Sequence, residues 1–446
     1  MAINETIRKE GIKKVGLLVE YFAESGGIEQ SIVTLCSELV RRGCTVWIYS
    51  CRPVSRKNQY RQALHSTGVL IFSLNPLLSR VAFLDLEIQL RLVRWVIFML
   101  SPILFVIAVT DAVFRHRSIR RSWTGVVGKV RRYLDISHLL EKLRYLPLVR
   151  YTHRYKPDII HVHGYGCGFV PAGGISAAAL CRLPIVYSEH GIPWNGLQDS
   201  SKIIRDLKQV NSLIAISEDS AECIRKSCLW SSKIPIIRHI VPMPVIKPGI
   251  IKHQSYLPLT ITCVAMMRPE KGHAILLQAA AQVIESYPQT QFFLIGDGPT
   301  RSDLEKQACK LGISDQIIFK GVLSHSEVEC AFQQTDIFVL PTFRESLGIA
   351  MIEAMSYGLP VVGTNAGGLL DLVKNGKNGL LVPPGNPDAL ADALRALIEN
   401  PSLRTKLAKA AQQSYTQGEF TPQAVGDAIL SVYREAVEIY HSQLGR

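Results

Sequence analysis

Short apolar runs alternate with longer amphipathic stretches along this chain. In the first half the apolar runs are nearly continuous, as expected of parallel strands that are covered on both faces. The predicted strands are Lys14–Glu20, Thr45–Cys51, Val69–Leu74, Asp158–His163, Pro184–Ser188, Ser212–Ile216 and Pro235–Val241. Helical patterns such as Glu29–Arg41 separate them. The pattern predicts a doubly wound α/β domain.

A second alternating set begins at Leu259. Its predicted strands are Thr260–Met266, Gln291–Ile295, Gln316–Phe319, Asp336–Leu340 and Pro360–Gly363. Between the two sets, Pro242–Pro258 contains four prolines and no periodicity, which is typical of a linker. Because single cores rarely grow beyond roughly 250–300 residues, a chain of 446 residues is expected to hold two domains. We expect these at 1–241 and 259–420, with the linker at 242–258.

An insertion at about 80–150 interrupts the first set. Residues Trp95–Thr110 carry no charge over 16 positions, but a helix of that length reaches only about 24 Å, against a hydrocarbon core of about 30 Å. A single crossing would also separate the first three strands from their sheet partners. We therefore expect this segment to lie on, or dip into, the cytoplasmic leaflet. A helical hairpin packed within the protein is the alternative.

Charge supports the membrane interpretation. The net charge is +13, and between Arg91 and Arg132 nine Lys and Arg residues face one acid, Asp111. This run predicts attraction to an anionic membrane surface through residues about 91–132. No RNA- or DNA-binding motif with interleaved aromatic residues accompanies it, so nucleic acid is not the expected partner.

The termini and cysteines indicate the compartment. Residues Met1–Lys14 are polar and contain no apolar stretch of the kind found in secretory signals. The ten cysteines are scattered without a Cys-x-x-Cys pair, which favours reduced thiols over a disulfide framework or a zinc site. We expect a cytoplasmic protein, peripherally associated with the inner face of the membrane.

Residues 341–368 carry the chemistry. A predicted strand leads into a loop that ends at Glu345, a helix carries Glu353, and the next strand ends in Gly363-Thr364-Asn365-Ala366-Gly367-Gly368. Eight positions of mostly helical chain separate the two carboxylates by roughly 12 Å. Glycosidase pairs lie about 5–9.5 Å apart, so this pair does not share one reacting bond. The spacing suits an elongated ligand, such as a nucleotide-sugar.

The Glu345-x₇-Glu353 spacing resembles the signature of the family-4 retaining glycosyltransferases. Further matches follow in the family's order over about 15–400: Gly26-Gly27, Arg268 with Lys271 and Gly272, Gly296-Asp297-Gly298, and Gly367-Gly368. The resemblance implies the GT-B fold, in which two Rossmann-like domains face a cleft and a last helix, here within 421–446, returns to the first domain. The chain departs from the family's Asn-Gly-x-Asp before the linker, where it has Val241-Pro242-Met243-Pro244.

The resemblance also implies roles for the donor-binding residues. Glu353 would accept hydrogen bonds from the ribose hydroxyls, Glu345 would meet the sugar hydroxyls, and the amides of Ser346 and Leu347 would bind the phosphates. Arg268 and Lys271 lie three positions apart, on one face if a helix begins there, and two such cations can neutralise a diphosphate. Since no Asp-x-Asp pair ends a strand, we expect no metal.

Glycines and one histidine complete the candidate site. Gly26-Gly27, after the first strand, is expected to let the backbone approach the ligand, although a tight turn explains it too. Gly296-Asp297-Gly298 is expected beside the base or diphosphate, and Gly367 and Gly368 against the donor. By resemblance His190 would face the donor sugar; the alternative is a structural histidine.

Together with the family resemblance, these observations predict a metal-independent hexosyltransferase without a cofactor, and the resemblance alone implies that it is retaining. Its donor would be a nucleotide-sugar, which the resemblance implies to be UDP-linked, and its acceptor a lipid-linked glycan or polysaccharide of the cell surface, such as lipopolysaccharide. Two alternatives stay open: a non-catalytic GT-B scaffold subunit of a membrane assembly complex, and a nucleotide-sugar 2-epimerase.

Overall fold

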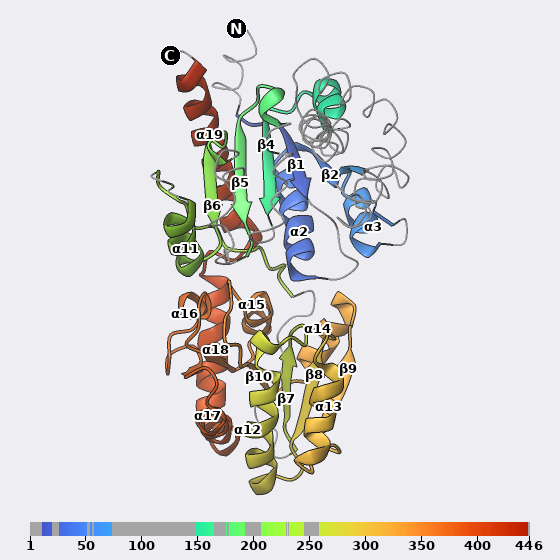
Figure 1. Cartoon of the computed structure of the whole chain (residues 1–446), viewed down its shortest axis with the longest axis vertical. Helices are drawn as coiled ribbons and strands as arrows, with labels where there is room; N and C mark the ends of the chain where they lie inside the picture. Colours follow the sequence, from blue (N-terminus) through green and yellow to red (C-terminus); the bar gives the residue numbers. More distant parts are fainter. Residues whose placement is uncertain are drawn as a thin grey trace, which may run out of the picture.

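In the computed structural model of this chain, two parallel six-stranded sheets lie one above the other in the view of Figure 1. The structure describes residues 11–19, 26–50, 54–55, 58–73, 148–164, 175, 178–191, 207–228, 230, 232–244 and 258–444. The apolar segment 95–110, the basic run 91–132 and all but the last three residues of the predicted insertion lie outside these ranges, as does most of the predicted linker.

The first sheet has the strand order β3-β2-β1-β4-β5-β6. Its strands are β1 (Lys14–Val19), β2 (Thr45–Ser50), β3 (Leu70–Ser73), β4 (Ile159–Gly164), β5 (Ile185–Glu189) and β6 (Ser212–Ala215). Its helices include α2 (Gly27–Arg41), α3 (Gln59–Ser66) and α11 (Glu218–Cys228). The strands β4 and β5 and the edge strand β6 are buried at every position, which is why their sequences are largely apolar.

The predicted strand Pro235–Val241 is wrong. Only one bridge, between Ala215 and Ile236, extends the sheet there. Beyond it the backbone finds other partners: the Ile240 amide donates to Ser31 Oγ (3.0 Å), and the Val241 amide donates to the Phe420 carbonyl (3.3 Å). The apolar run reflects burial and not a strand ladder: Ile237 and Ile240 belong to the apolar cluster of β1 and α2, and Val241 to that of the second domain.

The second sheet has the order β12-β11-β10-β7-β8-β9. Its strands are β7 (Thr260–Val264), β8 (Gln291–Ile295), β9 (Ile317–Gly321), β10 (Ile337–Leu340), β11 (Val361–Thr364) and β12 (Leu380–Val382). Its helical elements are η2 (Pro269–Lys271), α12 (His273–Ser286), α13 (Arg301–Lys310), α14 (His325–Gln333), α15 (Ile349–Ser356), α16 (Leu369–Leu372), α17 (Pro387–Glu399) and α18 (Pro401–Thr416). Five of the six strands coincide with predicted ones, while β12 is too short to show a pattern.

The last helix, α19 (Pro422–Leu444), leaves the second domain and packs against α2, β5 and β6 of the first. Its buried side chains, among them Val432, Tyr433 and Val437, belong to the same apolar cluster as β1 and α2. In Figure 1 it runs up beside the first sheet, so that the C-terminus lies at the end of the molecule furthest from the second domain.

The carboxyl ends of the two sheets point toward each other (Figure 1). Open parallel sheets bind ligands beyond these ends, so the arrangement directs both binding edges into one space. Among the described residues, no helix combines the length and apolarity that crossing a membrane requires.

Candidate functional site

A cavity of about 440 Å³ lies between the two sheets. Residues that follow strands of both domains line it: His190 and Ile216 from the first, Ala265 and Gly296 from the second. Ten of the predicted site residues are brought together on its wall, namely Gly26, Gly27, His190, Lys271, Gly296, Asp297, Glu345, Ser346, Leu347 and Glu353. Most of the predicted site residues therefore line one cavity, while the other residues of its lining, largely apolar, were not predicted.

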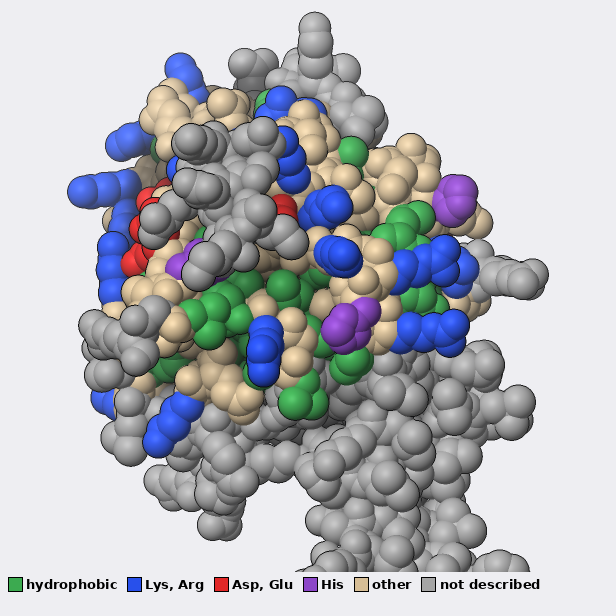
Figure 2. All heavy atoms as spheres, turned by 90° about the horizontal axis from the view of Figure 1, so that it is seen from above, with side chains coloured by type: hydrophobic (Ala, Val, Ile, Leu, Met, Phe, Trp, Pro, Cys, Tyr) green, Lys and Arg blue, Asp and Glu red, His purple; other side chains and the backbone are tan. Residues whose placement is uncertain are grey.

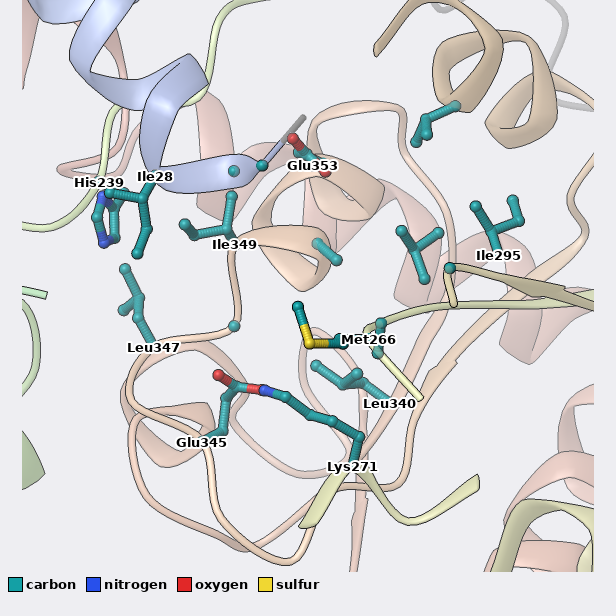
Figure 3. A pocket seen from close by; sticks show the side chains of 18 of the residues that line it. Ile28, His239, Met266, Lys271, Ile295, Leu340, Glu345, Leu347, Ile349 and Glu353 are labelled. Carbon is teal, nitrogen blue, oxygen red and sulfur yellow. The ribbon is translucent and has the colours of Figure 1, made fainter. Parts of the chain in front are cut away.

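One end of the cavity carries an ion pair. Lys271 Nζ donates to Glu345 Oε2 at 2.7 Å, and Figure 3 shows the two side chains reaching toward each other from opposite sides. The Glu345 side chain is only 9% exposed and that of Lys271 24%. A cation fixed in this way beside the cavity can meet an anionic group of a ligand.

The loop that carries Glu345 is held from two directions. On one side Thr342 Oγ1 and the Phe343 amide both donate to the Glu270 carbonyl, at 2.9 and 2.8 Å. On the other, the Gly368 amide donates to the Glu345 carbonyl at 2.9 Å. The position of the carboxylate thus depends on contacts from two separate turns.

Glu353 lies at the other end of the cavity (Figure 3). It stands in the body of α15, partly buried among Met351, Ile352, Ala354 and Met355. Burial, and then the negative charge of Glu329, raise the pKa of the Glu353 carboxyl to about 7. Hydroxyl groups that donate to this carboxylate would favour its ionised form.

Two helix N-termini meet between these ends. The helix α2 begins at Gly27 and α15 at Ile349, and both residues line the cavity (Figure 3). A Cβ on Gly27 would lie 2.9 Å from Ile349 Cγ2, so the helices approach this closely because the residue is glycine. Helix N-termini present amide donors and a positive dipole end, which favours anions such as phosphate.

The cavity has carboxylates at both ends and two helix N-termini between them. Two family models match the chain: "Glycosyl transferases group 1" over residues 255–414 and "Glycosyltransferase Family 4" over residues 105–242. The 2-deoxystreptamine glucosyltransferase of Streptomyces kanamyceticus is 32% identical over 64% of this chain and 77% of that enzyme. The chain belongs to the family-4, or group 1, glycosyltransferases.

Two further comparisons define how far the likeness extends. The alpha-D-kanosaminyltransferase of Streptomyces kanamyceticus is 33% identical, but the match spans only 39% of this glycosyltransferase and 44% of that relative. The crystal structure of Anabaena Alr3699/HepE in complex with UDP superposes with a TM-score of 0.65 and 20% identity over 94% of this chain and 99% of that one. That likeness confirms the GT-B fold.

Arg268 stands apart from the other predicted residues of this glycosyltransferase. The helix α12 begins only at His273, because Pro269–Lys271 form a single 3₁₀ turn that ends at Gly272 with φ 72°. Arg268 and Lys271 therefore do not share a helix face. The Arg268 side chain is 54% exposed, lies 3.9 Å from Glu270 and does not line the cavity.

Three predicted glycines lie behind the cavity wall. Gly298 packs on the Met267 backbone, while Gly367 and Gly368 lie against the backbone oxygens of Glu345 and Ser346, where any Cβ would collide. These two glycines support the loop that carries Glu345 and Ser346. Their predicted direct contact with the donor stays a prediction.

His190 belongs to a buried row of imidazole rings. Its Nε2 is hydrogen-bonded to His163 Nδ1 at 2.8 Å and its Nδ1 to His239 Nε2 at 3.3 Å, with the rings stacked. Burial, and then the neighbouring imidazoles of His239 and His163, hold the pKa of His190 well below its usual value. The ring is therefore neutral at pH 7, and both nitrogens are engaged by other histidines.

The row continues to the last helix. His161 packs against His163 with ring centroids 4.1 Å apart, as their alternation along one strand predicts. The two ring nitrogens of His161 are hydrogen-bonded to Ser188 Oγ (2.7 Å) and to Tyr433 Oη of α19 (2.8 Å). Cavity and α19 are thus joined by one chain of polar groups.

Among the lining residues that sequence reasoning missed, three have polar side chains: Tyr60, His239 and His325. Tyr60 fixes the glycine loop, since its Oη donates to the Gly26 carbonyl (2.9 Å) and accepts from the Gly26 amide (3.1 Å). His239 stands two residues before Val241, where the sequence departs from the family pattern. That departure was the one sequence signal that could have drawn attention to His239. His325 begins α14, and neither its spacing nor its neighbours distinguish it from a surface residue.

Proposed function

We propose that this glycosyltransferase moves a hexose from a UDP-sugar to a lipid-linked glycan or polysaccharide of the cell surface, with retention at the anomeric carbon and without a metal. The supporting observation is one cavity with the Lys271–Glu345 pair at one end, Glu353 at the other, and two helix N-termini between them. A sugar, a diphosphate and a ribose follow one another in that order along a nucleotide-sugar.

Each end has a role in this proposal. Glu353 accepts hydrogen bonds from the ribose hydroxyls, and the start of α15 receives the diphosphate. Glu345 accepts from sugar hydroxyls, while Lys271 exchanges part of its pairing with Glu345 for a phosphate oxygen. His190, neutral and held on both nitrogens, presents its ring to the sugar at the first-domain wall.

The chemical step needs no residue as a nucleophile. The bond between the anomeric carbon and the β-phosphate oxygen breaks, and the acceptor oxygen bonds to the same carbon on the same face. The acceptor proton passes to the departing phosphate oxygen. Lys271 stabilises the charge that develops on the diphosphate, and Arg268 joins it if its side chain turns from Glu270.

The proposed donor and the proposed acceptor rest on different comparisons. The structural neighbour HepE was crystallised with UDP, and also with UDP and glucose, which favours a UDP-linked donor. The relative whose name contains 2-deoxystreptamine indicates a small soluble acceptor as the competitor. Transfer assays with extracted lipid-linked glycans and with 2-deoxystreptamine in parallel will separate these two acceptor classes.

A thermal-shift panel tests the donor site. We expect one nucleoside diphosphate, UDP, to raise the melting temperature, since ligand at a hundred times its Kd stabilises by about 2.7 kcal/mol. Glu353→Ala should abolish most of this shift. Glu285→Ala, which removes an exposed carboxylate of α12 outside the cavity, is the matched control and should keep it. Equal stabilisation of all three proteins by UDP would contradict the proposed site.

Product analysis separates the alternatives. A transferase releases UDP only when an acceptor is present and keeps the donor's anomeric configuration in the product. A 2-epimerase would convert the UDP-sugar to its isomer without acceptor, and a scaffold subunit would do neither. Activity that persists in a chelator supports metal independence, whereas its loss would overturn that part of the proposal.

A further inference from the structure

The loops and helix ends that enter the first sheet carry exposed cations. Six of them lie where the chain approaches four different strands: Lys14, Arg150, Arg154, Lys156, Arg182 and Lys208. We call this surface the strand-entry face. It lies at the amino ends of the strands, opposite the carboxyl ends that line the cavity. It therefore has no part in the donor site.

These six cations form no ion pair within the part of the chain that the structure describes. The nearby acid Asp158 accepts the backbone amides of Lys13 and Lys14, at 2.9 and 2.8 Å, so it is engaged by the main chain. The neighbouring helix α19 adds Arg434 together with the acids Glu435 and Glu438, all exposed. The net charge of the strand-entry face therefore stays positive.

Exposed apolar side chains lie at the same end of the sheet, distributed across it. Leu180, in the helical turn before β5, is 78% exposed, Leu70 at the start of the edge strand β3 is 43% exposed, and Leu444 at the end of α19 is 63% exposed. In the described part of the first domain and α19 these are the large apolar side chains with high exposure. Figure 2 looks onto this end of the molecule and shows Lys and Arg side chains spread around hydrophobic ones.

We propose that the strand-entry face docks on an anionic phospholipid surface. Cations that form no ion pair are attracted to lipid phosphates and carboxylates, and their contributions add over a face. The leucines select lipid over other polyanions, because aliphatic side chains gain by entering the acyl boundary and have no counterpart on a nucleic acid backbone. Described residues alone carry this proposal, and it differs from the earlier expectation about residues 91–132.

Docking on this face fixes the distance between the membrane surface and the cavity. A six-residue strand such as β1 spans about 20 Å, and the cavity lies beyond its far end. An acceptor anchored in the same membrane must extend its reacting hydroxyl by about that distance. The proposal therefore favours a long lipid-linked glycan over a lipid headgroup as acceptor, and this consequence rests on the proposed function.

Vesicle flotation of the full chain tests the docking. We expect binding to phosphatidylcholine vesicles that contain phosphatidylglycerol, little binding to phosphatidylcholine alone, and a decline with added salt. Replacing Arg150, Arg154 and Lys208 by Glu should weaken binding to anionic vesicles by roughly a hundredfold at low salt. The matched control reverses three exposed lysines of the second domain, Lys310, Lys377 and Lys406, and should bind like the unmodified protein.

A leucine variant and a UDP-binding control accompany the vesicle experiment. Leu180→Ser should weaken anionic binding while leaving its salt dependence unchanged. UDP should stabilise every variant equally, which shows that each is folded and separates this test from that of the donor site. Equal vesicle binding by the face variant and the unmodified protein, or self-association that only the face variant loses, would overturn the proposal.

Discussion

At the scale of single residues, the cavity depends on two carboxyl groups in different surroundings. Burial, and then the negative charge of Glu329, raise the pKa of Glu353 to about 7, and this group stands among apolar side chains of α15. Glu345 is instead paired with Lys271 at 2.7 Å.

Nucleotide binding should consequently depend on pH through Glu353. If ribose hydroxyls donate to the ionised carboxylate, the affinity for UDP falls by roughly tenfold for each pH unit below about 7. Glu353→Gln should weaken binding at pH 8 and remove this dependence. Calorimetric titration between pH 5.5 and 8 measures it, and an equal slope in both proteins would contradict the assignment.

The stability of the ligand-free protein should change in the opposite direction. Because folding raises the pKa of Glu353 from 4.5 to about 7, the folded state holds a proton that the unfolded state releases. The free energy of unfolding therefore falls as pH rises through this interval. Urea unfolding of Glu353→Gln, which cannot ionise, should lack that part of the decline.

At the scale of elements, the loop at 341–348 is shaped by turns far away in sequence. Gly367 has φ 52° and lies against the Glu345 backbone oxygen. Gly376 has a similar φ of 71° with no atom near its missing Cβ. The two glycines thus share the left-handed backbone, but only Gly367 supports the site.

Replacing Gly367 and Gly376 by alanine, one at a time, separates the cost of backbone strain from the effect on ligand binding. Both Gly367→Ala and Gly376→Ala should lose about 1–2 kcal/mol through the left-handed backbone. Only Gly367→Ala should also displace the Glu345 loop and weaken UDP-sugar binding by at least roughly tenfold. Parallel unfolding and binding measurements check this. Unchanged donor affinity in Gly367→Ala would show that the loop is positioned by other contacts.

At the scale of the whole molecule, the two domains are joined by more than the chain. Asp371 of α16 accepts the Glu218 amide at the start of α11 (2.9 Å), and its Oδ2 lies 3.6 Å from Arg238 Nη2. The Tyr415 hydroxyl donates to the Val241 carbonyl at 3.0 Å, and Gly27 touches Ile349 across the cavity. These contacts set the separation of the two halves of the site.

Removing Asp371 should loosen this arrangement. Asp371→Ala deletes a helix cap worth about 0.5–2 kcal/mol together with an ion pair, both across the domain boundary. We expect a larger radius of gyration in solution scattering and weaker donor binding. Asp427→Ala, which breaks a surface pair with Arg42 away from the cavity, is the control. A compact Asp371→Ala protein with normal affinity would show that the other contacts suffice.

Much of this architecture is readable from local patterns. Apolar runs predicted eleven of the twelve strands, because a strand buried on both faces leaves a continuous signal. The run at Pro235–Val241 gave a wrong prediction for the same reason, since a buried segment outside a strand ladder can have the same composition as a strand. Spacing also placed Glu345 before α15 and Glu353 within it, since helical rise fixes their separation.

The sequence by itself determined the two α/β domains, their family and the carboxylates at each end of the cavity, because these depend on short-range periodicity and spacing. Only the tertiary structure decided that Tyr60 clamps Gly26, that His239 and His163 engage His190, and that Arg268 turns aside to Glu270. Such contacts join residues from different strands and helices, and their geometry exists only after the sheets have packed.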